Sequence, residues 1–116
     1  MIIEELIIAY LKESEIPGVG THVYAETPKD EPDEYIIVEK TGGPKEDGIT
    51  HPTIAVQSLS AESLLRAAEI NEAVKELMED IPDYENVYGC VLNTDYNYTD
   101  TETRMYRYQA VFVLDY

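Results

Sequence analysis

The fold of this chain is decided by its last residues, Asn86–Tyr116, which read NVYGCVLNTDYNYTDTETRMYRYQAVFVLDY. Two runs of alternating apolar and polar residues flank a polar stretch at 99–103, a pattern typical of a β-hairpin. Closing the hairpin over that stretch places even-numbered residues opposite one another on one face of the pleat. The predicted pairs are Tyr98–Arg104, Tyr96–Tyr106, Thr94–Tyr108, Leu92–Ala110, Cys90–Phe112 and Tyr88–Leu114.

This even-numbered face divides into an apolar half and a tyrosine-rich half. The apolar half, which we expect to pack under a helix, consists of Tyr88, Cys90, Leu92, Ala110, Phe112 and Leu114. Tyrosine combines a large contact area with a polar end and is enriched at protein–protein interfaces. The tyrosine-rich half therefore predicts a contact with another subunit, although cover by the chain's own loops would also explain it. The predicted interface residues are Tyr96, Tyr98, Arg104, Tyr106 and Tyr108, with Arg107 on the opposite face.

The residues before the hairpin predict two helices and three strands. Apolar residues at helical spacing indicate a helix at 2–13 and a second at 60–80, with Ser60 as its N-cap and Pro82 after its end. Strands are expected at 21–26, 35–40 and 49–59, with a flexible turn at 41–48. The order α-β-β-β-α-β-β indicates a single α+β domain over residues 1–116, with about five mostly antiparallel strands and two packed helices.

Asn71 falls within the apolar face of the second predicted helix. It either satisfies a backbone group where the helix meets the sheet or marks an interface, and the sequence leaves both readings open.

The charge of the chain excludes several classes of partner. Eight basic and 24 acidic residues among 116 give a formal net charge of −16. Such a surface repels phosphate backbones and anionic membranes, so we expect neither nucleic-acid binding nor membrane binding. The first residues carry acids where a signal peptide needs basic ones, which predicts a protein made and kept in the cytoplasm.

No pattern in the sequence indicates catalysis, a metal site or a cofactor. Cys90 lies on the apolar face of a predicted strand, which favours a buried hydrophobic role. His22 and His51 lie at strand ends without a recognisable nucleophile motif nearby. Residues 95–106 begin like a calcium loop but carry Asp100 where glycine is needed and Tyr106 where a bidentate glutamate is needed, so a hairpin tip is favoured.

An acidic loop lies between the first two predicted strands, at 27–34, with the sequence TPKDEPDE. Its carboxylates offer the hard oxygens that calcium or magnesium prefers, but its prolines favour a solvated loop. We predict that this loop contacts a neighbouring subunit through Asp30, Glu31, Asp33 and Glu34.

Four segments of the chain together resemble a known family. They read MIIEELIIAYLKE at 1–13, EYIIVEKTGG at 34–43, HPTIAVQSLSAESLLRAAEINEAV at 51–74 and LNTDYNYTDTETRMYRYQAVFVL at 92–114. The combination is similar to small head–tail junction proteins of long-tailed phages and prophages of Gram-positive bacteria, described as tail-terminator, tail-completion or minor capsid proteins. None of the segments is a catalytic signature.

The resemblance implies a non-enzymatic structural protein of the virion, assembled in the cytoplasm of a bacterial host. It implies a homo-oligomeric ring, usually of six copies, that terminates or completes the tail tube and contacts the tail tube protein and the head connector proteins. DNA would at most pass through the lumen, and the negative charge fits that role. The alternatives are a head-side connector or minor capsid component, an acidic DNA mimic or inhibitor, and a small hydrolase or metal enzyme.

Overall fold

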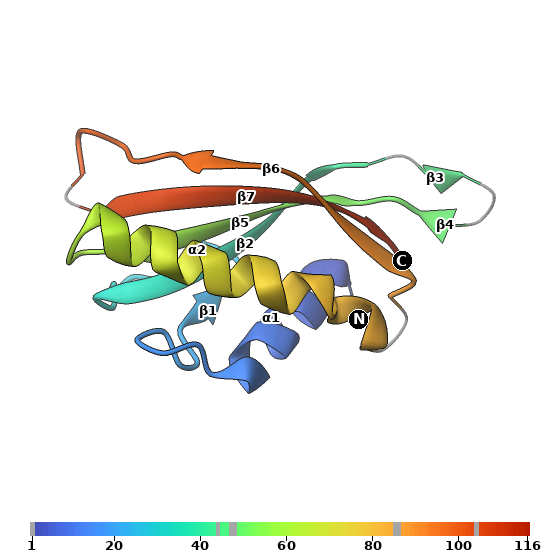
Figure 1. Ribbon diagram of the computed structural model, residues 1–116, viewed down its shortest axis with the longest axis horizontal. Helices are drawn as coiled ribbons and strands as arrows, with labels where there is room; N and C mark the ends of the chain where they lie inside the picture. The colour runs from blue at the N-terminus through green and yellow to red at the C-terminus, as the bar shows by residue number, and fades with distance from the viewer. Residues whose placement is uncertain (1, 44, 47–48, 85–86, 104) are drawn as a thin grey trace.

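The computed structural model describes residues 2–43, 45–46, 49–84, 87–103 and 105–116 of the chain. Two layers make up the molecule, a twisted sheet and a pair of helices packed on one of its faces (Figure 1). The molecule is elongated, with principal extents of 44 × 26 × 25 Å. In chain order the elements are α1 (Ile3–Ser14), β1 (Val23–Tyr24), β2 (Glu34–Gly42), β3 (Lys45–Glu46), β4 (Ile49–Thr50), β5 (Thr53–Ser60), α2 (Leu64–Glu79), the 3₁₀ turn η1 (Ile81–Asp83), β6 (Gly89–Asn97) and β7 (Tyr106–Asp115).

The main sheet has five strands in the order β1-β2-β5-β7-β6. β1 runs parallel to β2, and the other neighbouring strands are antiparallel. The predicted α+β class and element order are confirmed. β3 lies within the predicted turn and pairs with β4, which forms the first two residues of the strand expected at 49–59. That strand is interrupted at His51 and Pro52. Proline lacks the backbone donor that a continuous ladder would need there.

The core lies between the helices and one face of the sheet. Both helices contribute apolar side chains to it, and β2, β5 and β7 supply the facing residues. β2 is buried on both faces from Tyr35 to Val38, as its apolar run predicted for a strand inside the sheet. The largest fully buried side chains of the molecule include Tyr35, Phe112, Ile7, Leu11, Ile36, Ile54, Ile70 and Met78.

The second helix begins later than predicted. Its N-cap is Ser63, whose Oγ accepts the backbone N–H of Arg66 at 3.1 Å. The prediction of Ser60 was wrong because that residue ends β5, and its hydroxyl donates to Glu34 at 2.8 Å. Between them, the backbone N–H of Ala61 donates to the carbonyl of Asp33, so the turn is held by the loop before β2.

The register of the β6–β7 hairpin also differs from the prediction. Cys90 pairs with Leu114 and Leu92 with Phe112, two residues further along β7 than expected. The loop is longer than predicted, since β6 ends at Asn97 and β7 begins at Tyr106. Because the shift is even, the apolar residues stay on the helix-facing side, where Cys90, Ala110, Phe112 and Leu114 join the core as predicted. Tyr88 and Leu92 remain exposed instead, by 72% and 40%.

A β-bulge between Leu92 and Thr94 shifts the β6–β7 pairing by one residue, so that Thr94 pairs with Val111. The extra residue changes which side chains face the helices in the rest of β6. Asp95 now lies opposite Ala110 and reaches α2, where its carboxylate accepts from Asn71 at 2.9 Å and from Lys75 at 3.1 Å. Asn71 is fully buried, and its side-chain amide donates to the Asp95 carboxylate on the sheet. The sequence had suggested that it bonds a backbone group or marks an interface.

Candidate interface on the uncovered face of the sheet

The bulge separates the tyrosines that were predicted to share one face. Tyr96 pairs with Gln109, on the sheet face that neither helix covers, and Tyr98 stacks on Arg107 there. Tyr108 pairs with Ser58 and Tyr106 with Ser60, in the row that continues the helix-facing residues of β5. The prediction of one continuous tyrosine surface was therefore wrong, because a single extra residue in β6 reverses the alternation of side chains.

Three of the four tyrosines that were predicted at the interface are exposed at the surface. The exposed fractions of Tyr96, Tyr98 and Tyr106 are 39%, 46% and 40%, while Tyr108 is half-buried. The rings of Tyr96 and Tyr98 meet edge to face, with centroids 5.7 Å apart. An interface role for the four tyrosines stays a prediction, and Arg104 lies outside the described residues.

Arg107 lies on the uncovered face beside these tyrosines. Its guanidinium carbon lies 4.6 Å from the centre of the Tyr98 ring, in cation–π contact. Its Nε donates to the carbonyl oxygen of Tyr98 at 2.9 Å. We expected Arg107 on the opposite face from the tyrosines; it lies with Tyr96 and Tyr98 because the bulge brings those two residues over to its side.

A row of hydrogen-bonded polar side chains crosses the same face. Gln57 on β5 donates through Nε2 to Oε1 of Gln109 on β7 at 3.1 Å. Gln109 in turn donates through Nε2 to the hydroxyl oxygen of Tyr96 on β6 at 2.6 Å. Both glutamines are buried, so the network fixes the positions of Tyr96 and of its neighbours. The sequence analysis did not identify this row, although each of the two strands carries a glutamine beside apolar residues, which was a visible signal.

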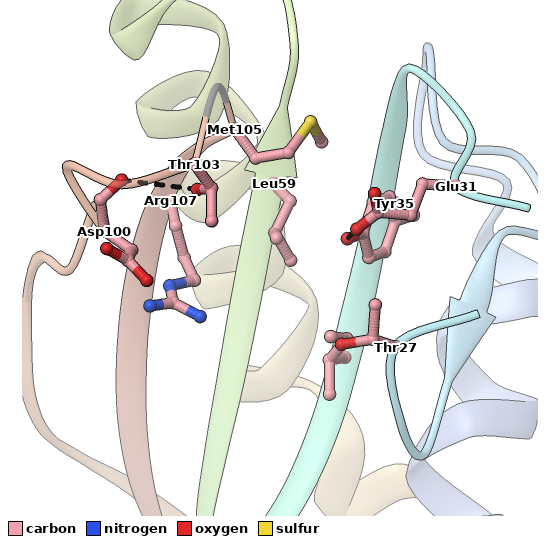
Figure 2. A pocket seen from close by; sticks show the side chains of 9 residues that line it. Thr27, Glu31, Tyr35, Leu59, Asp100, Thr103, Met105 and Arg107 are labelled. Carbon is pink, nitrogen blue, oxygen red and sulfur yellow. Dashed lines mark hydrogen bonds between the residues drawn. The ribbon is translucent and has the colours of Figure 1, made fainter. Parts of the chain in front are cut away.

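A cavity of about 380 Å³ opens on this face next to Arg107. Arg107, Leu59 and Tyr35 lie opposite one another on β7, β5 and β2, and form part of its wall (Figure 2). The acidic loop closes one side of the cavity through Thr27 and Glu31. The hairpin tip closes the other side through Asp100, Thr103 and Met105. Two segments that were predicted to be interface elements, about 70 positions apart in the sequence, thus line the same cavity.

Tyr35 connects the acidic loop to the sheet. Its hydroxyl donates to Oε1 of Glu31 at 2.7 Å. Burial, followed by this hydrogen bond to a carboxylate, raises the pKa of Tyr35 above its ordinary value. The phenol therefore stays protonated and serves as a donor at every physiological pH.

The four acidic residues of the loop have different environments. Asp30, Glu31 and Asp33 are exposed, in agreement with a solvated loop. Glu34 is buried and bonds Arg66, so the expectation of a solvated carboxylate was wrong at this position. The Arg66 guanidinium lowers the pKa of Glu34 against the opposing effect of burial. A contact of the loop with a neighbouring subunit stays a prediction.

The described residues provide little for metal or nucleophilic chemistry. Within the described ranges, no group of three or more His, Cys, Asp or Glu side chains is placed to hold a metal ion. His22 contacts the Tyr24 hydroxyl at 2.9 Å, and His51 contacts Asp115 at 2.6 Å, each close to a strand end. Burial raises the pKa of Cys90 to about 12, so its thiol is protonated and unreactive at neutral pH.

Neither helix among the described residues has the length and apolar composition that crossing a bilayer requires.

Comparisons with known proteins show a likeness in fold. No protein-family model matches the chain, and no curated protein sequence matches it. Among solved structures, the fold is similar to that of a chain in the virion of a native gene transfer agent particle, with a TM-score of 0.73 and 12% sequence identity. The match covers 97% of this chain and 92% of that chain, so the two share their whole fold.

Proposed function

We propose that this protein is a non-enzymatic structural component of a phage or prophage virion, located at the head–tail junction. In this role it forms a homo-oligomeric ring, of six copies, that terminates or completes the tail tube. The observation that carries the proposal is the likeness, over nearly the whole chain, to a component of a gene transfer agent virion. The resemblance of four sequence segments to head–tail junction proteins supports it independently.

The surface of the molecule supports an assembly role. The uncovered sheet face presents exposed aromatic residues and a fixed polar row, features that are enriched at protein interfaces. The cavity on this face is lined by two loops and three strands, and an enclosed arrangement of acid, base and nucleophile is not found among its lining residues. A contact surface for other proteins accounts for these features better than an active site does.

The charge supports a ring through which DNA passes. A net charge of −16 per copy repels the phosphate backbone, so DNA would move through the lumen without adhering to its wall. The tail tube protein on one side and the head connector proteins on the other are the partners that this position requires.

Purification of the protein, alone and mixed with the tail tube and connector proteins encoded near it, tests the proposal. Electron microscopy of negatively stained samples and light scattering after size-exclusion chromatography are expected to show a ring that binds the end of the tail tube. A monomer in isolation is compatible with assembly on a partner. The absence of any ring or complex in all mixtures would contradict the proposal.

A head-side connector or minor capsid protein is the nearest alternative, and the same fold likeness supports it. Pairwise binding separates the two roles, since a terminator binds the tail tube protein and a head-side connector binds only the connector ring. A gene position directly before the major tail protein gene would favour the terminator.

An acidic DNA mimic is a second alternative, motivated by the net charge alone. It predicts tight binding to a basic nucleic-acid-binding protein, in competition with DNA.

A further inference from the structure

Among the described Lys and Arg residues whose side chains are held by hydrogen bonds, Arg107 is the one without a carboxylate partner. Arg66 contacts Glu34 and Glu69, and Lys75 contacts Glu72 and Asp95. Arg107 makes no ion pair with any carboxylate in the described part of the chain. The protein has 24 acidic residues and eight basic ones. An arginine that is held in place without a carboxylate partner can therefore bind a carboxylate from outside the chain.

The guanidinium is fixed in position by neutral groups. Nε donates to the Tyr98 carbonyl, the flat face stacks on the Tyr98 ring, and Nη1 lies 3.5 Å from Oε1 of Gln57. Nη2 makes no hydrogen bond with the described residues. The outer edge of the guanidinium therefore retains donors in the geometry that suits a carboxylate.

The polar row adds a second donor on the same face. Gln57 donates to Gln109, and Gln109 donates to the oxygen of Tyr96. Since the Tyr96 oxygen already accepts a hydrogen bond, its own O–H is left to donate outward. Arg107 and Tyr96 thus present donors on an uncovered sheet face, and the network between them fixes both in advance.

We propose that this donor pair binds a carboxylate of a second copy of the chain, so that the uncovered sheet face forms the contact between neighbouring subunits. The inference rests on the proposed ring and names the contact that closes it. A second copy supplies the matching charge, because its surface is strongly acidic. The outer side of α2 is one source, with the exposed acids Glu76 and Glu79.

The relative positions of these two surfaces suit a ring. Both helices pack on one side of the sheet, and the uncovered face is the opposite side (Figure 1). A contact between opposite sides of successive copies is heterologous, and heterologous contacts generate closed rings when the rotation is right. The pairing also lowers the repulsion between the two acidic surfaces where they meet.

Cross-linking of assembled rings tests the inference directly. An Arg107→Lys variant keeps the charge and adds an amine that carbodiimide joins to a carboxylate within contact distance. Rings are assembled from equal amounts of ¹⁵N-labelled and unlabelled copies, and mass spectrometry identifies the peptide joined to residue 107. A cross-link between labelled and unlabelled copies is expected. Cross-links only within one copy, for example to Glu31 or Asp100 beside the cavity, or no cross-link at residue 107, would overturn the proposal.

Charge reversal provides the second measurement. Arg107→Glu is expected to lower the assembled fraction at least tenfold in sedimentation velocity, and Tyr96→Phe is expected to lower it severalfold. Lys12→Glu makes the same charge change at an exposed position of α1, so it is the matched control and should leave assembly unchanged. Assembly of Arg107→Glu to the same extent as that of Lys12→Glu would refute the contact. Rings that form normally in that variant would leave the proposed function intact, whereas no ring with any partner would contradict the proposed function itself.

Discussion

The Arg66 guanidinium forms a two-pronged ion pair with the Glu34 carboxylate, with Nη2 2.8 Å from Oε1 and Nε 2.8 Å from Oε2. The same guanidinium donates to the carbonyl of Pro17 at 2.8 Å, and the Ser60 hydroxyl also donates to Oε2 of Glu34. One side chain on α2 thus connects the start of β2, the end of β5 and the loop after α1. Glu34 is 8% exposed, so the pair is largely shielded from water.

Arg66→Ala is expected to destabilise the fold by about 2–3 kcal/mol, because it leaves the Glu34 carboxylate buried without its cation. The estimate lies at or below the usual range for buried pairs because the Arg66 side chain is 24% exposed. Chemical denaturation measures the loss. Glu69→Ala removes the other, exposed carboxylate from the same guanidinium and serves as the control, with an expected change below about 0.5 kcal/mol.

The pH dependence of stability should report the same ion pair. The pKa of Glu34 is lower in the folded state than in the unfolded chain, where it is about 4.3. Its contribution is therefore complete above that value and is lost as the pH falls through the folded-state pKa. Glu34→Gln should flatten the decline in melting temperature below about pH 4.5. An unchanged acid limb in this variant would show that other carboxylates govern acid unfolding.

Gly18→Ala should destabilise the protein by more than about 2 kcal/mol. Gly18 has φ +86°, and an added Cβ would collide with the Glu34 carboxylate and the Arg66 guanidinium. Gly20 has φ +58° and open space around it, so Gly20→Ala carries only the backbone cost of about 1 kcal/mol. Thermal unfolding of the two variants separates steric collision from backbone strain, and equal losses would argue against the collision.

Asp95→Ala should cost about 1–2 kcal/mol, since it leaves the buried amide of Asn71 without its acceptor. It also removes the contact with Lys75, and with it the interactions that favour the bulged register of β6. Asp100→Ala at the exposed hairpin tip is the control, with a change within about 0.5 kcal/mol. Backbone amide chemical shifts of β6 would reveal whether the register moves, and hydrogen exchange along β6 should rise only in Asp95→Ala.

Tyr106→Ala should weaken assembly more than it lowers the melting temperature, because 40% of the side chain is exposed. Tyr35→Ala is the contrasting variant. Tyr35 is 1% exposed, so its truncation should cost about 3–5 kcal/mol of stability. If Tyr106→Ala lost assembly and stability in equal proportion, Tyr106 would be a core residue and not part of an interface.

The sequence predicted those features of the fold that depend on local periodicity. Helical spacing located both helices, and alternation located the long hairpin and its apolar half, including Ala110, Phe112 and Leu114. The candidate site was predicted less well. Tyr96 and Tyr98 were predicted as interface residues, but they were placed on the same sheet face as Tyr106 and Tyr108, which is wrong. Gln57, Gln109 and the donor role of Arg107 were not identified.

The reason is that register is not a local property. A single extra residue near Asn93 reverses every side chain beyond it, and its position depends on contacts that α2 makes through Asn71 and Lys75. The start of α2 was misplaced for a related reason, since Ser60 and Ser63 are equivalent as N-caps by residue type. Only the pairing of Ser60 with Glu34 in the sheet distinguishes them.

The sequence by itself thus determined the class of the fold, the order of its elements, most of its apolar core residues and its acidic surface, because these follow from the spacing and chemistry of neighbouring residues. The tertiary structure alone decided which face each residue of the hairpin tip occupies. It placed the acidic loop and the tip around one cavity, buried Glu34 against Arg66, and left Arg107 without an acid. Each of these depends on contacts between residues far apart in the chain, and the free energies of those contacts select among registers that local pattern leaves nearly equal.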